Sequence, residues 1–294
     1  MRLSCLIPVY RLDASRLIND LTAQCRELQI DFEILVLDDS AEYRDVNWQV
    51  QLDQQEVKFI NPTRNLGRAL ARNRLLAEMT GDFGLFLDGD MRIAEKFLAG
   101  YMQAIEAYPD AILVGGIVYE KGESLRYAIG KKRESKPAHE RDANPFHGFT
   151  VANVLFPRKI ALNYSFSDKI LSYGHEDTLF GLALMEGNEK IVHIDNPAIH
   201  QGIDSDEDML KKVEASLETL AFLYKHEPLM ARNKDKVKVL KTALYFSDWL
   251  PIFWFDRVKS AWRKLLLSKR YTLICYDLYK LSYLIFTLKH QKSS

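Results

Sequence analysis

The feature that most constrains this chain is a short apolar run that ends in two carboxylates, Leu85-Phe86-Leu87-Asp88-Gly89-Asp90. Such a run is typical of a buried strand, and the strands of parallel sheets end in loops where ligands bind. Gly89 lets the backbone turn so that both carboxylates, or one of them through water, face a single point. Two hard oxygen ligands suit Mg²⁺ or Mn²⁺, which also take phosphate oxygens. The alternative is a plain polar turn, because Asp-Gly is a common turn pair.

Apolar strands alternate with helical patterns along the first 120 residues or so. The predicted strands are 3–9, 32–37, 57–60, 83–87 and 111–119, and the predicted helices are 14–28, 68–79 and 95–108. This alternation predicts an α/β fold, with a mostly parallel, Rossmann-like sheet and helices on both faces. Because strand C-termini share one edge of such a sheet, Asp38 and Asp39 should lie on the same rim as Asp88 and Asp90.

The chain is long enough for one large domain, or for one domain with an appendage, and its charge is unevenly distributed. It has 294 residues and a formal net charge of zero. From Lys236 to the end it carries 12 basic and 3 acidic residues, a net charge of about +9, so the preceding part carries about −9. A basic tail on an acidic body indicates an anionic surface as a partner for the tail.

The cysteines and the N-terminus indicate a cytoplasmic protein. Cys5, Cys25 and Cys275 are far apart and show no metal-binding spacing, so we expect reduced thiols. The apolar stretch after Arg2 is short and interrupted by Pro8, unlike a signal peptide. No segment reaches the roughly 18 apolar residues of a membrane span.

Five short motifs occur in a fixed order. They are Ile7-Pro8-Val9-Tyr10, Leu37-Asp38-Asp39-Ser40, Asn65-Leu66-Gly67 with Ala71-Arg72-Asn73, Asp88-Gly89-Asp90, and Gly174-His175-Glu176-Asp177. Together they resemble family 2 glycosyltransferases of the GT-A fold. The resemblance covers roughly residues 1–205, which predicts a GT-A domain over 1–205 and a helical, basic and aromatic region over 206–294. One departure is Arg11, where the family usually has Asn, in a loop that borders the nucleotide.

The resemblance implies an inverting transferase that moves a sugar from a nucleotide-diphosphate donor, here a UDP-sugar, to a glycan or lipid-linked acceptor. The donor-binding candidates are Pro8, Tyr10, Asp38, Asp39, Asn65, Gly67, Arg72, Asp88 and Gly89. Asp39 can accept the imide N–H of uracil, which favours uridine. The alternative for the acid pair is turn formation or helix capping. Arg72 is placed near the nucleotide and Arg68 on the surface, although a solvated helix face is open for both.

The resemblance also implies the catalytic base and the metal site. Inversion needs a base for the acceptor hydroxyl, and the resemblance points to Asp177, with Glu176 supporting it or binding the acceptor. The alternative is that both acids only complement the helix dipole, which lowers a carboxylate pKa while neighbouring acids raise it. Family members often have a histidine near the metal, which implies that His200 joins Asp88 and Asp90 around Mn²⁺ or Mg²⁺.

The acceptor candidates are the least constrained. His147 and Asn153 lie in an aromatic and apolar segment that leads toward the acceptor in the family, and His175 belongs to the last motif. For His147 and Asn153 the alternative is a satisfied position inside the core. The charged stretch 119–143 is interpreted as a solvated charge run, with a mobile loop over the donor as the alternative.

The C-terminal region interleaves aromatic and basic residues after a helix predicted at 205–226. Examples are Tyr245, Phe246, Trp249, Trp262, Arg257, Lys259, Arg263 and Lys264, with Pro251 breaking a helix. This pattern predicts helices on an anionic membrane surface, hence a peripheral protein on the inner face of the membrane. The alternative is a helical subdomain packed on the sheet, with a dimer surface. Nucleic acid is not expected, because the rim is acidic.

Two other functions fit parts of the pattern. A sugar nucleotidyltransferase also uses a doubly wound sheet and Mg²⁺, but it needs a glycine-rich basic loop after the first strand, and residues 8–13 contain no glycine. A non-catalytic carbohydrate-binding relative is expected to lose the acids, yet Asp88, Asp90, Glu176 and Asp177 are all present. The transferase is therefore the leading interpretation.

Overall fold

A computed structural model describes residues 1–52, 55–170, 172–201, 204–247, 252–268 and 272–292. Trp249 and Pro251 lie outside these residues. The chain forms two compact units. The first comprises 1–121, 130–168 and 176–202, and the second comprises 122–129, 169–175 and 203–294. The first unit is thus built from three stretches of chain, and two short segments of the first 205 residues belong to the second unit.

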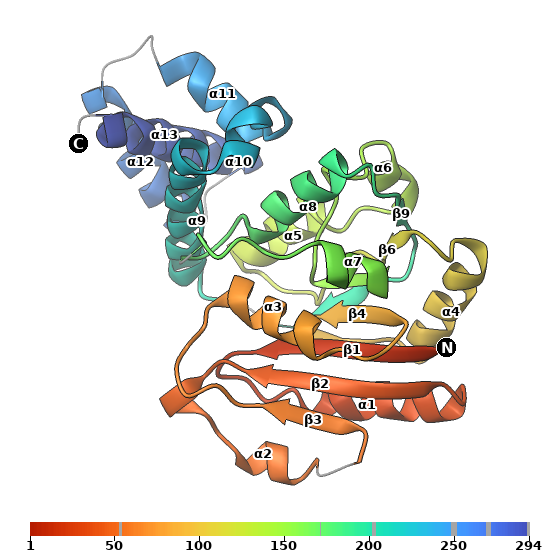
Figure 1. The fold of residues 1–294 in the computed structure, drawn as a ribbon. Helices are drawn as coiled ribbons and strands as arrows, with labels where there is room; N and C mark the ends of the chain where they lie inside the picture. The colour runs from red at the N-terminus through yellow and green to blue at the C-terminus, as the bar shows by residue number, and fades with distance from the viewer. Residues whose placement is uncertain (53–54, 171, 202–203, 248–251, 269–271, 293–294) are drawn as a thin grey trace. The chain divides into compact units, whose positions relative to one another are not determined.

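The first unit is organised around a seven-stranded sheet (Figure 1). In spatial order its strands are β3 (Val57–Ile60), β2 (Asp31–Asp38), β1 (Arg2–Val9), β4 (Phe83–Leu87), β8 (Asn153–Pro157), β6 (Ile112–Val114) and β9 (Ile191–His193). All neighbours are parallel except β8, which runs antiparallel to β4 and β6. The predicted strands over 3–9, 32–37, 57–60 and 83–87 are confirmed to within about one residue.

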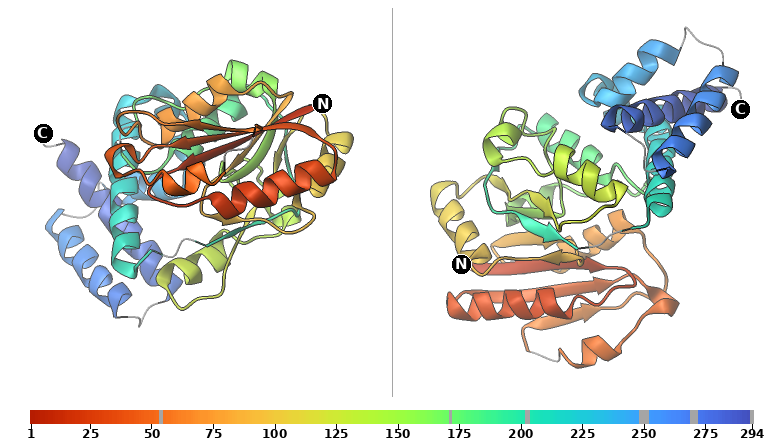
Figure 2. Two further views of the ribbon diagram at one scale, coloured as in Figure 1. Left: turned by 90° about the horizontal axis from the view of Figure 1, so that it is seen from below. Right: turned by 180° about the vertical axis from the view of Figure 1, so that it is seen from behind.

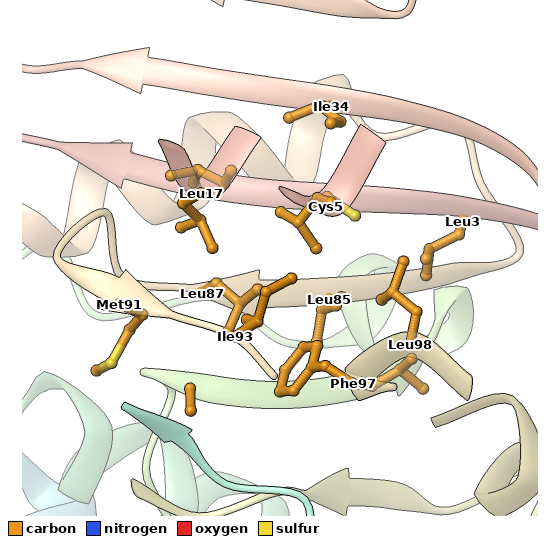
Figure 3. Packing of buried hydrophobic residues seen from close by; sticks show 14 of the residues in the cluster. Leu3, Cys5, Leu17, Ile34, Leu85, Leu87, Met91, Ile93, Phe97 and Leu98 are labelled. Carbon is orange, nitrogen blue, oxygen red and sulfur yellow. The ribbon is translucent and has the colours of Figure 1, made fainter. Parts of the chain in front are cut away.

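Helices cover both faces of this sheet (Figure 2). On one face α1 (Ser15–Glu27) packs against α4 (Phe97–Ala107), and on the other α3 (Arg68–Glu78) packs against α7 (Arg158–Asn163). Alternate residues of β1 point into the α1–α4 side, as the period of two requires. Figure 3 shows Leu3 and Cys5 there with Leu17 of α1 and Phe97 of α4. The predicted mixed α/β architecture is therefore confirmed.

Short elements complete the first unit. They are η1 (Ala41–Tyr43), α2 (Asn47–Val50), α6 (Ala138–Asp142), α8 (Glu176–Glu186), and a second sheet in the order β5 (Met91–Arg92), β10 (Ala198–His200), β7 (Ile117–Tyr119). Helix α5 (Leu125–Arg133) has residues in both units. The cysteines Cys5, Cys25 and Cys275 are buried free thiols, as predicted.

Two sequence predictions for the middle of the chain were wrong. The predicted strand 111–119 is two strands in different sheets, β6 and β7, separated at Gly115 and Gly116. Gly116 has φ +86°, and a Cβ there would lie 2.8 Å from the Arg141 guanidinium. The charged stretch 119–143 holds α5 and α6 rather than only a solvated run. Within α6 the buried Arg141 side chain donates to the carbonyls of Val114 and Ile194, which a charge pattern alone does not reveal.

The second unit is helical. Its elements are α9 (Asp206–His226), α10 (Pro228–Arg232), η2 (Lys234–Lys236), α11 (Lys238–Ser247), α12 (Ile252–Leu267) and α13 (Leu273–Lys292). Ser205 caps α9 by accepting the Asp208 N–H at 3.1 Å. The hydrophobic core of the second unit joins Leu210 of α9, Leu266 of α12 and Tyr279 of α13. Among the described residues, no helix is both long enough and apolar enough to cross a membrane.

Candidate active site

Arg72 lies at the centre of the candidate site and is bound by three carboxylates. Its side chain is 3% exposed. Nη1 donates to Glu176 Oε1 at 3.2 Å and to Asp177 Oδ1 at 3.1 Å, and Nη2 donates to Asp88 Oδ1 at 3.1 Å. Burial alone would lower the arginine pKa, but the three carboxylates outweigh it and the pKa lies above its usual range. Arg72 therefore joins the loop after β4 to the start of α8.

Both oxygens of Asp177, the predicted base, are bound by protein groups. Its Oδ2 accepts the Val151 N–H at 3.0 Å and the Thr150 hydroxyl at 3.3 Å, while Oδ1 faces Arg72. Burial raises its pKa most, Arg72 lowers it and Glu176 raises it again, and the net shift is upward. The lowering expected from the helix dipole is therefore outweighed by burial. A carboxylate with a raised pKa is a stronger base than an ordinary aspartate, provided that it is ionised.

Asp90 pairs with His200 beside this cluster. His200 Nε2 lies 3.3 Å from Asp90 Oδ2, and His200 is the last residue of β10 rather than part of a loop, because β10 pairs with β5 there. Burial alone would raise the Asp90 pKa, but the hydrogen bond and charge of His200 outweigh it, so the pKa is lowered. An ionised Asp90 is the state that a cation requires.

The Asp90–His200 pair fits one side of a divalent metal site. Asp90 Oδ1 and His200 Nδ1 are buried and find no hydrogen-bond partner among the described residues. In that part of the chain no three metal-ligating side chains converge on one point. Mg²⁺ and Mn²⁺ bind through one or two carboxylates, with waters and substrate phosphates filling the other positions. The donor set therefore suits a metal that arrives with a diphosphate.

The acids after β2 are held by protein groups. Asp38 is 2% exposed; its oxygens accept the Ser40 N–H at 3.0 Å and the Gln49 side-chain N–H at 2.8 Å. Asp39 Oδ1 accepts the Leu66 N–H at 2.6 Å, and Oδ2 accepts the Gly67 N–H at 2.9 Å. Burial raises the Asp39 pKa most, and the two N–H groups lower it less. Asp39 is 6% exposed, and in both acids each oxygen accepts one of these N–H groups and keeps one lone pair.

The loop before α3 and the loop after β4 place the predicted donor residues close to one another. Gly67 has φ +79°, which favours glycine, and directly precedes α3. The Asn65 side-chain amide donates to the Asp39 carbonyl at 2.9 Å. A Cβ on Gly89 would lie 3.0 Å from Val9 Cγ2 and 3.2 Å from the Pro8 carbonyl oxygen, so the loop after β4 crosses close to the end of β1. These contacts put the predicted donor residues of four motifs on one rim.

The sequence model of glycosyl transferase family 2 matches residues 4–164, more than half of the chain. The chain belongs to glycosyl transferase family 2. It is therefore a glycosyltransferase, as the resemblance of its motifs predicted.

One sequence relative and two solved structures are similar to this glycosyltransferase. An uncharacterized glycosyltransferase, YfnE of Bacillus subtilis (strain 168), is 23% identical over 93% of this chain and 81% of that protein. The S. aureus TarS 1-349 structure has a TM-score of 0.54 at 16% identity, covering all of this chain and 92% of the 1-349 chain. The mannosyltransferase PcManGT from Pyrobaculum calidifontis, in complex with GDP-Man and Mn²⁺, has a TM-score of 0.57 at 14% identity. This match covers 99% of this chain and 87% of the PcManGT chain. The two structures support the fold.

The acceptor candidates of this glycosyltransferase differ in accessibility. Asn153 is 0% exposed; it accepts the Tyr101 hydroxyl at 2.7 Å and donates to the carbonyls of Gly116 and Asn196. Acceptor contact by Asn153 is therefore wrong, because every polar atom of its side chain is used in the core. His147 is exposed, and His175 has a left-handed backbone with φ 66°. Both stay candidates.

Sequence reasoning missed the residues that position the acids. Thr150 and the Val151 N–H hold Asp177, and Arg44 Nε lies 3.6 Å from Asp38 Oδ2. The one sequence signal for Thr150 was its hydroxyl group within the mostly apolar segment 149–155. No sequence pattern linked Thr150 to Asp177. Arg68 is 52% exposed, in agreement with its predicted surface position. Tyr10 is exposed, and Pro8 is a partly buried residue of β1.

Proposed function

We propose that this chain is an inverting glycosyltransferase that moves a sugar from a UDP-sugar to a hydroxyl group of a glycan or lipid-linked acceptor, assisted by Mn²⁺ or Mg²⁺. The observation that carries the proposal is the arrangement of Asp177. Its carboxylate is fixed by Val151 and Thr150 and linked through Arg72 to Asp88, one residue before the donor-side Gly89. A base and a donor-side acid held by one guanidinium suit a single displacement between donor and acceptor.

In this mechanism each residue has a defined task. Asp177 takes the proton of the acceptor hydroxyl as that oxygen attacks the anomeric carbon. The C–O bond to the diphosphate breaks on the opposite face, so the anomeric configuration inverts. Asp90 and His200 would hold the metal from one side, and the metal would supply positive charge to the leaving diphosphate. Asp88, the third predicted ligand, is bound to Arg72 and would approach the metal through water. Arg72 keeps Asp177 and Asp88 in fixed positions, and Glu176 accepts from the same nitrogen of Arg72 as Asp177 does.

The two relatives in complex with nucleotides set the choice of donor to be tested. TarS has been crystallised with UDP and with UDP-GlcNAc, and PcManGT with GDP-Man. UDP should raise the melting temperature more than GDP or CDP, and more with Mn²⁺ than with EDTA, because a ligand that binds only the folded state stabilises it. A thermal-shift series over these nucleotides measures this. If no nucleotide diphosphate shifts the melting temperature, the proposed function is wrong.

Asp90→Ala should remove the metal dependence of UDP binding and leave the fold intact. Without its carboxylate the site loses one of its oxygen ligands and the partner of His200. Calorimetry of UDP binding with and without Mn²⁺ should show a large metal effect in the wild type and almost none in the variant. Asp110→Ala is the control, because Asp110 is exposed in the turn before β6. Equal metal effects in both variants would remove Asp90 from the site.

We also propose that the second unit contacts an anionic membrane, as the sequence pattern predicted. On α11, Lys241 is exposed, Tyr245 is 67% exposed and Phe246 is 42% exposed. Lys241 and Tyr245 are one helical turn apart, so a base and an aromatic ring share a face. Exposed aromatics beside lysines are typical of helices that lie in the headgroup region.

Tyr245→Ser with Phe246→Ser should reduce flotation with vesicles that contain anionic phospholipid, while the wild type floats at low salt and less at high salt. Point variants are preferable to removing the tail, because α13 supplies core residues to α9. Leu162→Ser is the matched control, since Leu162 is 73% exposed on α7. A wild type that stays in solution at low salt would show that this surface serves another purpose.

A further inference from the structure

Arg11 follows β1 and has a backbone conformation that arginine rarely adopts. Its φ is 52°, in the left-handed region that asparagine and glycine favour. Its N–H donates to the hydroxyl of Ser40, which is 2% exposed, at 2.6 Å. Next to this bond, the Asp39 N–H donates to the Val9 carbonyl at 2.9 Å. The unusual backbone is thus fixed by bonds between the ends of β1 and β2, and an arginine occupies it although asparagine fits better.

The side chain of Arg11 is also held in place, by aromatic rings. Its guanidinium carbon lies 3.7 Å from the centre of the Tyr43 ring and 5.1 Å from that of Tyr10. Both rings are accessible, with 60% of Tyr43 and 53% of Tyr10 exposed. Cation–π contacts of this kind attract a guanidinium to a ring face. In the described part of the chain these rings are the contacts of the guanidinium, so its N–H groups are left for a ligand.

We propose that Arg11, laid on Tyr43, is a specificity-determining residue that donates an N–H to a carbonyl oxygen of the nucleobase. This rests on the proposed function, which puts a UDP-sugar on this rim. The segment Asp39-Ser40 carries both the carboxylate that would accept an imide N–H and the hydroxyl that fixes Arg11. Uracil offers an imide N–H flanked by two carbonyl oxygens. A donor beside an acceptor matches that edge, whereas cytosine has an unprotonated ring nitrogen in place of the imide and an amino group in place of one carbonyl oxygen.

The observed strain supports a functional purpose for Arg11. Residues held in sparsely populated backbone regions cluster at active sites and at ligand-binding positions. No ion pair of Arg11 appears among those of the described residues, so the rings are the contacts that order it. A guanidinium donor to a carbonyl oxygen is a charge-assisted bond, stronger than a neutral one.

The test replaces Arg11 by the residue that its backbone favours. Arg11→Asn should weaken UDP binding about 10-fold or more, as expected for the loss of a hydrogen bond from a charged group. Its affinity for pyrophosphate should change less than about twofold, and its preference for UDP over CDP should fall. Its melting temperature should stay the same or rise by up to about 2 °C, since the backbone is relieved. Calorimetry with UDP, CDP and pyrophosphate, each with Mn²⁺, gives these values.

Two further variants complete the experiment. Tyr43→Leu removes the ring under the guanidinium and should weaken UDP but not pyrophosphate. Gln29→Asn is the matched control, because Gln29 also has a left-handed backbone, φ 53°, but lies before the start of β2, at the opposite edge of the sheet. Its UDP affinity should equal that of the wild type. Unchanged UDP binding in Arg11→Asn, or equal losses for UDP and pyrophosphate, overturns the assignment of Arg11. A wild type that binds no nucleotide diphosphate overturns the proposed function itself.

Discussion

Asp177→Asn should lower kcat by about 10² to 10⁴, the usual contribution of general-base catalysis, and leave UDP binding almost unchanged. The amide has the shape of the carboxylate and can still accept the Val151 N–H through its oxygen. Arg72 keeps Asp88 and Glu176 as partners, so the fold should survive. Steady-state kinetics with the donor identified by thermal shift, together with calorimetry of UDP, measure the two effects separately. Asp110→Asn should behave as the wild type.

The pH profile gives a second measure of the same base. The pKa of Asp177 is raised above 3.8, so kcat/KM should fall as the pH drops through this raised value, where the carboxylate takes up a proton. The wild-type product should have the opposite anomeric configuration to the donor, which NMR of the product shows. Retention of configuration, or normal turnover in Asp177→Asn, would contradict the assignment of Asp177.

Arg72→Met should cost about 3–5 kcal/mol of unfolding free energy, because it leaves buried carboxylates without their cation. Of the three carboxylates, Glu176 should contribute most to this cost, because its side chain is only 5% exposed to solvent. Methionine fills most of the volume of the arginine side chain. The loss of stability therefore measures the missing charge rather than a cavity. Urea unfolding at neutral pH measures it. At acidic pH the loss should shrink, because protonated carboxyl groups no longer need a cation.

Arg74→Met is the matched control for this substitution. Arg74 lies on the same helix, is 56% exposed, and pairs with Glu78 at 2.7 Å. An exposed pair of this kind contributes up to about 0.5 kcal/mol. Arg72→Lys should be more stable than Arg72→Met but should still lose activity, because an ammonium group does not span three carboxylates in fixed geometry. A loss below about 1 kcal/mol in Arg72→Met would show that solvent already screens this cluster.

The first half of the fold could be predicted from the sequence because its signals are local. The strands β1 and β4 are short apolar runs, and the helix α3 follows a glycine with left-handed φ. The strand β8 could not be assigned, since an apolar run does not tell which neighbours it pairs with or in which direction. The break between β6 and β7 depends on the approach of Arg141 from elsewhere in the chain.

For the site, the sequence indicated the chemical groups but not their contacts. Asp88, Asp90 and Asp177 stood out because acids at strand and helix ends are suited to metals and protons. The bond between Arg72 and Asp177 joins residues 105 positions apart, and no local pattern encodes it. Asn153 shows the opposite error. Its polarity suggested a ligand contact, although the same amide satisfies buried carbonyl groups.

The segment 150–152, just before β8, links Asp177 to the loop after β4, and this sets its length. Val151 and Thr150 hold Asp177, while the Ala152 carbonyl accepts the Asp88 N–H at 3.2 Å, immediately before Asn153 enters the sheet. One residue more or fewer here would turn the side chains of the strand to the wrong face or move Asp177 away from the loop after β4. Insertions and deletions among natural homologues should therefore avoid this segment, and loop-grafting experiments should leave its length unchanged.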